Sequence, residues 1–209
     1  MSSIEKTDKT RLQQQIQFLL EADKIKSILR RNRVLNGERL ENDAEHSWQL
    51  ALMAVVLSEY ADPKADLLHV VKMLLVHDLV EIDAGDTFAF DPDALQTQRG
   101  REELAAARVF GLLPADRAAE MSALWEEFEA QATPEAKFAG AMDHLGGGVL
   151  PNCRHNGGCW REAGVSTERV KARNRPIAAG SFVLWDYAEA LIDDTEAKGF
   201  ISGRESSVK

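Results

Sequence analysis

Four groups in this chain have the side-chain types that bind a divalent metal ion. They are His46, the adjacent pair His77-Asp78, and Asp143, and each lies in an otherwise apolar segment. Charged side chains are rarely buried unless they are paired or bind a metal, because an unpaired buried charge costs several kcal/mol. Two imidazoles and two carboxylates suit manganese, iron, cobalt, nickel or zinc, and this mixed ligand set does not choose among them. The sequence therefore predicts a divalent metal site.

A fifth group, Glu81, follows Asp78 by one helical turn. An open coordination position on the metal would hold a water molecule and lower its pKa toward neutrality. Glu81 would then orient or deprotonate that water as a general base. The alternative is structural, with a solvated polar helix end at His77-Asp78 and Glu81 and a hydrogen-bonded core histidine at His46.

Helical periodicity accounts for most of the chain, because apolar residues recur three and four positions apart. No alternating strand pattern, internal repeat or linker is present, and the Gly-rich stretch 146–164 is expected to be irregular. We therefore predict an all-α protein that forms a single domain over 1–209, with residues 1–8 frayed. The expected helices are about 9–30, 42–57, 62–81, 94–111, 115–131, 134–145, 165–174 and 181–198.

Capping signals predict where three of these helices begin. Asn42 with Glu45 resembles a capping box, which places His46 in the first turn of its helix. Asp62-Pro63 and Thr133-Pro134 each combine an N-cap residue with proline at the first helical position. On these helices, His46 and His77 are expected to face the same core.

The composition excludes several classes of partner. The formal net charge of −9 argues against duplex nucleic acid or an anionic membrane as the main partner. No run of eighteen apolar residues exists and the first residues lack a signal-peptide pattern, so we expect a cytoplasmic protein. Cys153 and Cys159 are expected to be free thiols in a loop, since no second ligand pair of zinc-finger type lies nearby.

The order His46, His77-Asp78, Asp143 resembles the H…HD…D signature of the HD-domain metal-dependent phosphohydrolases. The surrounding residues are similar to the small 5'-nucleotidase branch, which hydrolyses deoxynucleoside 5'-monophosphates. The motifs span about residues 25–145, and weaker similarity extends through the helices of 165–199. The matching stretches are Glu41–Ser47, Leu75–Glu81, Gly85-Asp86 and Glu135–Asp143.

This resemblance implies an all-helical HD fold that acts as a homodimer. It implies that one divalent ion is bound by the four groups named above, with Glu81 and Asp86 acting near the substrate phosphate. A single ion is favoured because no histidine lies between Asp78 and Asp143, the interval from which dinuclear HD enzymes draw further ligands.

Two arginines are candidates for binding the phosphate by the same resemblance. Arg31 lies fifteen residues before His46, where the family has a phosphate-contacting arginine, and Arg39 matches a second family arginine. The bacterial nucleotidase has Arg-Trp where this chain has Arg31-Asn32, so a base-stacking residue is missing here.

The leading hypothesis is a phosphomonoesterase that removes phosphate from (deoxy)nucleoside 5'-monophosphates by attack of a metal-bound water. A second hypothesis is an HD hydrolase of another phosphate ester, such as a nucleoside triphosphate or alarmone. Those substrates call for a larger basic cluster, which the sequence lacks downstream of His77. A third is a non-catalytic helical module with a structural metal, which would leave Glu81 and Asp86 without a role.

Overall fold

The structure, a computed structural model, describes residues 3–203. Its elements are almost all helical, which confirms the predicted all-α class. Of the segment 1–8 that we expected to be frayed, residues 1 and 2 lie outside the described part, and the first helix begins at Ser3. No described helix combines the length and the apolar character needed to cross a membrane.

The elements follow one another in this order: α1 (Ser3–Ala22), η1 (Asp23–Ser27), β1 (Leu29–Arg33), β2 (Leu40–Asn42), α2 (Asp43–Val56), η2 (Ser58–Tyr60), α3 (Leu67–Val76), η3 (His77–Val80), α4 (Glu81–Ala84), α5 (Pro92–Phe110), α6 (Ala115–Ala130), α7 (Pro134–Asp143), η4 (His144–Val149), α8 (Leu150–Arg154), α9 (Gly158–Glu162), α10 (Thr167–Asn174), α11 (Ile177–Gly180) and α12 (Phe182–Ala197). The elements η1, η2 and η3 are 3-10 helices, and η4 is a π-helix.

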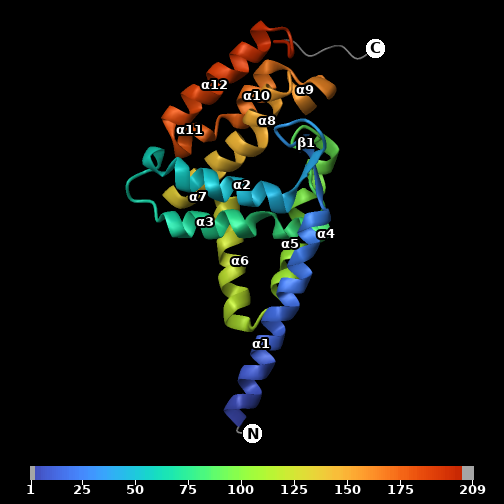
Figure 1. Ribbon diagram of the computed structural model, residues 1–209, viewed down its shortest axis with the longest axis vertical. Coiled ribbons are helices and arrows are strands. Elements are labelled where there is room, and N and C mark those ends of the chain that lie inside the picture. Colours follow the sequence, from blue (N-terminus) through green and yellow to red (C-terminus); the bar gives the residue numbers. More distant parts are fainter. Residues whose placement is uncertain (1–2, 204–209) are drawn as a thin grey trace.

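Helices α2, α3 and α7 form the centre of the molecule and pack on one another. In Figure 1, α8 to α12 form a layer above them, while α5, α6 and the long α1 extend below. The central helices meet through fully buried side chains, among them Leu50 of α2, Met73 and Leu74 of α3, and Phe138 and Met142 of α7. Burying each such side chain stabilises the fold by about 1.5–3 kcal/mol. The helices that carry the candidate metal ligands are thus fixed by the core.

A short sheet replaces the end of the first expected helix. We expected helix to about Arg30, but α1 ends at Ala22 and residues 29–33 form β1, antiparallel to β2. Exposure alternates along β1, so that Arg30 and Asn32 point inward while Arg31 points outward. The helical prediction was wrong there because the pairing of β1 with β2 is a tertiary contact that local periodicity does not include.

Two other expectations about elements were wrong. Helix α3 begins after Asp66, whose carboxylate accepts hydrogen bonds from the N–H groups of Leu68 and His69, and not at Asp62-Pro63. The stretch 146–164, expected to be irregular, is largely helical and includes η4, α8 and α9. By contrast, the predicted N-caps Asn42 and Thr133 are both confirmed.

Candidate metal centre and substrate cavity

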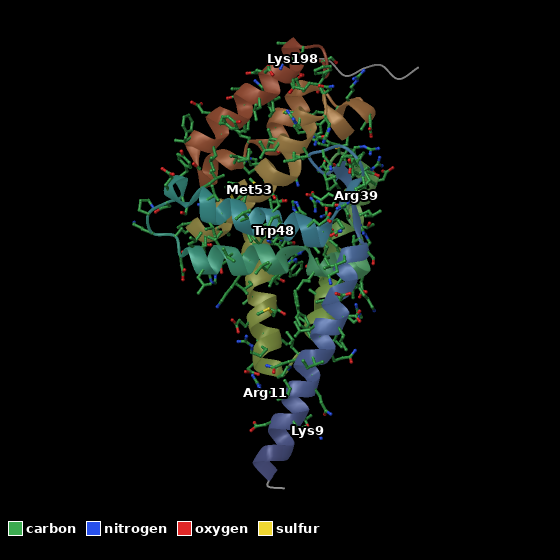
Figure 2. The ribbon with its side chains drawn as sticks, in the orientation of Figure 1. Lys9, Arg11, Arg39, Trp48, Met53 and Lys198 are labelled. Carbon is green, nitrogen blue, oxygen red and sulfur yellow. The ribbon has the colours of Figure 1, made fainter. Side chains whose placement is uncertain are left out.

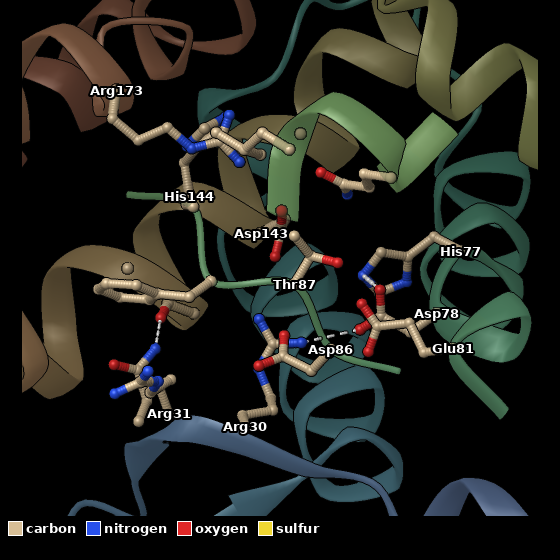
Figure 3. A pocket seen from close by; sticks show the side chains of 18 of the residues that line it. Arg30, Arg31, His77, Asp78, Glu81, Asp86, Thr87, Asp143, His144 and Arg173 are labelled. Atoms are coloured by element: carbon tan, nitrogen blue, oxygen red, sulfur yellow. Dashed lines mark hydrogen bonds and ion pairs between the residues drawn. The ribbon is translucent and has the colours of Figure 1, made fainter. Parts of the chain in front are cut away.

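A cavity of about 430 Å³ opens where β1, η3, α7 and η4 meet the loop between α4 and α5. Figure 3 shows side chains converging on it from these elements. The cavity brings together most of the residues that the sequence predicted for the site. Those lining it are Arg31, His77, Asp78, Glu81, Asp86 and Asp143.

The four candidate metal ligands meet at one end of the cavity. The Nε2 atom of His46 lies 3.1 Å from Oδ1 of Asp143 and 3.7 Å from Oδ2 of Asp78. The Nε2 atom of His77 lies 3.2 Å from Oδ1 of Asp78. One ligand atom from each of His46, His77 and Asp143 fits within 4.8 Å of the others. Residues almost 100 positions apart in the sequence therefore present ligand atoms to a common point.

The hydrogen bonding of His77 leaves one ring nitrogen available to a cation. Its Nδ1 lies 2.9 Å from the carbonyl oxygen of Leu74, and because a carbonyl only accepts, Nδ1 is the protonated nitrogen. The buried Nε2 has no hydrogen-bond partner. Burial lowers the pKa of His77, so its ring is neutral at pH 7. A lone pair on Nε2 beside a carboxylate oxygen of Asp78 is unfavourable until a cation binds to both.

His46 reaches the site because its helix starts where the sequence predicted. The side chain of Asn42 accepts from the N–H of Glu45, whose carboxylate accepts in return, so His46 lies in the first turn of α2. Burial and Arg30 act to lower the pKa of His46, but hydrogen bonds to Asp143 and Glu41 outweigh them and raise it to about 9. In the metal-free protein the His46–Asp143 pair therefore holds a proton that a metal ion must displace.

Asp143 is followed by a run of glycines whose backbone passes close to both Asp143 and His46. It is the last residue of α7, and the chain continues into the π-helix η4, an element that is rare and frequent at functional sites. A Cβ atom on Gly147 of η4 would lie 2.6 Å from Cε1 of His46 and 3.2 Å from Oδ1 of Asp143. Only glycine allows the backbone to approach the two ligands this closely.

A second group of carboxylates lies beside the first. Asp78 lies in η3 and Glu81, three residues later, begins α4, so the two side chains lie on the same side of this helical stretch. Carboxylate oxygens of Asp43, Glu81 and Asp86 lie within 4.8 Å of one another. Burial, the charge of Asp78 and a hydrogen bond with Asp43 raise the pKa of Glu81, and burial raises that of Asp86. Glu81 thus holds a proton at neutral pH in the metal-free protein and is poised to exchange it.

The sequence reasoning missed Arg30 and Asp43. The largely buried guanidinium of Arg30 lies between the metal-ligand cluster and the second cluster of carboxylates. Its Nη1 lies 3.0 Å from Oδ2 of Asp78 in the first and 3.2 Å from Oδ1 of Asp43 in the second. Burial opposes this charge, but Asp78 and the other carboxylates raise the pKa of Arg30. The available signal for Arg30 was its place in a short alternating strand. Asp43 gave no signal, since acidic residues are common at helix N-termini.

The two predicted phosphate-binding arginines have different positions. Arg31 is exposed at the edge of the cavity, with its guanidinium 4.9 Å from the centre of the Phe88 ring. Arg39 lies on the surface and donates to both carboxylate oxygens of Glu45, at 2.8 and 2.6 Å (Figure 2). The structure therefore brings Arg31 to the cavity and leaves Arg39 outside the set of residues that line it.

Asn32, which takes the place of the base-stacking residue that the resemblance implied, has a structural role. Its Nδ2 donates to the carbonyl oxygen of Gly147. Its Oδ1 accepts from Nδ2 of Asn152 at 2.9 Å and from Sγ of Cys159 at 3.2 Å. Asn32 fastens β1 to η4 and is not free to contact a base. As predicted, Cys159 and Cys153 are free thiols, although both lie in helices.

Known proteins resemble this chain in sequence and structure. The family described as HD domain matches residues 22–185. The human protein 5'-deoxynucleotidase HDDC2 is 34% identical over 129 residues, which cover 61% of this chain and 62% of the human one. The Danio rerio protein of the same name is 30% identical, over 62% of this chain and 64% of its own. The chain thus matches a little over three fifths of the length of these curated relatives.

A solved structure covers nearly the whole chain. It is the crystal structure of a predicted metal-dependent phosphohydrolase from Magnetospirillum magnetotacticum MS-1. The two chains are 48% identical and superpose with a TM-score of 0.88, over 92% of this chain and 96% of the other.

Proposed function

This chain belongs to the HD-domain family, and from that premise we propose that it is a metal-dependent phosphomonoesterase acting on (deoxy)nucleoside 5'-monophosphates. The observation that carries the proposal is the buried, unpartnered Nε2 of His77 beside Oδ1 of Asp78. The names of the human and Danio rerio relatives support the substrate class. The Magnetospirillum structure supports metal-dependent phosphate hydrolysis.

The residues present fit a divalent ion. His46, His77, Asp78 and Asp143 would hold it, since neutral imidazole and carboxylate are ligands for manganese, iron, cobalt, nickel and zinc. The Leu74 carbonyl fixes the tautomer of His77, which is the usual arrangement for a metal-binding histidine. This donor set does not determine which ion binds.

The remaining residues of the site have roles that match ester hydrolysis. When bound, the ion would activate water and neutralise charge on the phosphoryl oxygens. Glu81 exchanges a proton with the attacking water, and Asp86 at the cavity wall holds the proton or hydrogen bond needed near the ester. Arg31 stabilises negative charge on the phosphate, and Arg30 keeps Asp78 oriented through its 3.0 Å contact.

The cavity favours catalysis over a structural metal. A structural site is closed by its protein ligands, and this site opens instead into a space lined by Glu81 and Asp86. Metal removal is expected to abolish activity without unfolding the protein, whereas loss of a structural metal would unfold the chain. Circular dichroism before and after chelation separates the two cases.

The direct test is phosphate release from ribo- and deoxyribonucleoside mono- and triphosphates. The protein is stripped of metal and resupplied separately with manganese, cobalt, zinc, iron, nickel or magnesium. We expect release from monophosphates that depends on the added ion. Phosphate release from triphosphates alone would replace the proposal with the second hypothesis. No phosphate release from any of these nucleotides, with metal bound, would contradict both.

We also propose that residues 1–209 form a single HD domain that assembles as a homodimer in the cytoplasm. Exposed apolar side chains on the faces of α2 and α3 support dimerisation, and Trp48 of α2 is 62% exposed (Figure 2). The others on these two helices are Leu52, Val55, Val56, Leu68 and Leu75. The free thiols support a reducing compartment. Light scattering of Trp48→Glu, which we expect to be monomeric, tests the dimer.

A further inference from the structure

Carboxyl groups outnumber arginines in the lining of the cavity. The carboxylates that line it are Asp78, Glu81, Asp86, Glu102, Glu129 and Asp143. A phosphate monoester brings up to two more negative charges, and like charges at close range in a partly buried site repel strongly. Binding such a substrate therefore requires positive groups in the cavity that are not already neutralised by the protein.

Two of the four arginines that line the cavity are already paired with carboxylates. Arg30 contacts Asp43 and Asp78, as described above. Arg99 donates to Glu103 and Glu126, each at 2.8 Å. The two others that line the cavity, Arg31 and Arg173, make no ion pair or side-chain hydrogen bond to a carboxylate within residues 3–203. Besides the ion proposed above, these are the two arginines of the lining that are available to an anionic ligand.

Arg173 is projected from a rigid part of the wall. It lies in the last turn of α10, next to the buried Asn174, whose Nδ2 donates to the Val170 carbonyl at 2.8 Å. A Cβ on Gly148 would come within 2.8 Å of Oδ1 of Asn174. The end of α10 therefore packs directly on η4, the element that follows the candidate ligand Asp143.

A cation in the last turn of a helix often only complements the helix dipole. Lys171 of the same turn fits that role, since its Nζ lies 2.6 Å from Asp193 and 3.4 Å from Glu189 on α12. Arg173 instead points toward the cavity beside His144 (Figure 3). In the same figure, Arg31 lies on a different side of the cavity, that of β1.

We propose that Arg173 is a second phosphate-binding residue, which binds the phosphate monoester from α10 while Arg31 binds it from β1. The planar guanidinium offers two parallel N–H donors to a phosphate, which a single ammonium group does not. The proposal rests on the proposed function for the identity of the ester. It adds a substrate residue from the C-terminal helices, outside the motifs that carry the metal site.

Binding of inorganic phosphate tests this proposal without any turnover. Isothermal titration of phosphate into the metal-loaded protein compares wild type, Arg173→Met and Arg175→Met. The control removes the same charge two residues away, where Arg175 lies over the Trp185 ring, 5.0 Å from its centre, and outside the cavity lining. We expect about 10- to 100-fold weaker binding for Arg173→Met, the worth of a hydrogen bond to a charged group, and near wild-type binding for the control.

Equal phosphate binding by wild type and Arg173→Met would overturn the proposal, as would no measurable phosphate binding by wild type. Because Arg173 is exposed, its loss should leave the thermal unfolding midpoint unchanged. Arg173→Lys gives a second variant that retains the charge and should recover part of the affinity. Partial recovery of phosphate binding by Arg173→Lys would support the proposal, whereas wild-type binding by both Arg173→Lys and Arg173→Met would overturn it.

Kinetics distinguish this proposal from the nucleotidase assignment. If monophosphates are hydrolysed, KM of Arg173→Met should rise by about the factor seen for phosphate binding. An unchanged KM for monophosphates with a raised KM for triphosphates would overturn the proposal and leave the metal-dependent hydrolase intact. Weaker phosphate binding in a protein that hydrolyses no nucleotide would support Arg173 and contradict the proposed function.

Discussion

The cavity has a buried end and an exposed edge, and the two differ in what holds their side chains. The buried end, here called the metal wall, consists of His46, His77, Asp78 and Asp143. Both histidines of the metal wall are under 5% exposed and are fixed by helices of the central core. The exposed edge, here called the mouth, consists of Arg31, Phe88 and Arg173, which come from a strand, a loop and α10.

This difference separates chemistry from substrate selection. Reacting groups must be held within a fraction of an ångström, which buried helices achieve through packing and hydrogen bonds. At the mouth, Arg31 is positioned by a cation–π contact with Phe88, and neither Arg31 nor Arg173 makes an ion pair within residues 3–203, so the two arginine side chains can adjust to a ligand. Changes in the metal wall should abolish function, and changes in the mouth should weaken it by degrees.

The largest effect is expected in the metal wall. His77→Ala and Asp78→Ala should each lose stoichiometric metal, and turnover should fall at least ~1000-fold with the loss of the ion's stabilisation of charge. Metal content by mass spectrometry and phosphate release check this. His69→Ala is the control, since His69 pairs with Glu127 at 2.8 Å outside the cavity lining. Full metal content in both ligand variants would contradict the assignment.

The next largest effect is expected for Glu81, which lies beside the metal wall and exchanges a proton with the attacking water. Glu81→Gln keeps the shape of the side chain but removes its acid–base function, so metal binding should persist while turnover falls by about two to four powers of ten. Asp83→Asn, on the same helix α4 and paired with Arg108 at 2.7 Å, is the control. Wild-type turnover in Glu81→Gln would make Glu81 a structural residue.

The metal wall should also bind its ion more tightly as the pH rises. The pKa of His46, about 9 in the metal-free protein, lies above neutrality, so at pH 7 its ring is protonated and the ion must displace that proton. One displaced proton makes the apparent affinity rise about tenfold per pH unit between pH 7 and 9. Titration of manganese at several pH values measures this slope. An affinity that does not change over this interval would contradict the proton between His46 and Asp143.

The smallest effect is expected at the mouth. Arg31→Met should raise KM for a monophosphate about 10-fold, with metal content unchanged, because one charge-assisted contact is lost. Arg39→Met should leave KM unchanged, since Arg39 pairs with Glu45 on the surface. Steady-state kinetics of both variants shows whether Arg39 also contributes to substrate binding. An equal rise in KM for Arg39→Met would extend the binding surface to the residue that precedes β2.

Much of the metal wall was predictable because its residue types are unusual where they occur. His77-Asp78 lies within an apolar helical run, and Asp143 lies near the end of another. Such polar groups are rarely buried unless they are paired or bind a metal ion. The capping box at Asn42 and the cap at Thr133 were confirmed, and together they set the register of His46 and Asp143. Local rules therefore sufficed for the helices that carry the candidate ligands.

The rest of the site depends on contacts that local rules do not include. Arg30 was assigned to a helix end, but pairing between β1 and β2 turns it inward onto Asp43 and Asp78. Arg173 had no signal, because a basic residue in a last helical turn is ordinary and its position depends on packing of α10 against η4. Strand pairing and packing of distant helices are tertiary effects that override local propensity.

Anomalous diffraction from crystals of the manganese-loaded protein would locate the ion directly. We expect one strong peak at the metal wall, in contact with Nε2 of His46, Nε2 of His77 and carboxylate oxygens of Asp78 and Asp143. No peak there in active, manganese-loaded crystals, or a strong peak only elsewhere, would contradict the claim that these four residues form the metal centre.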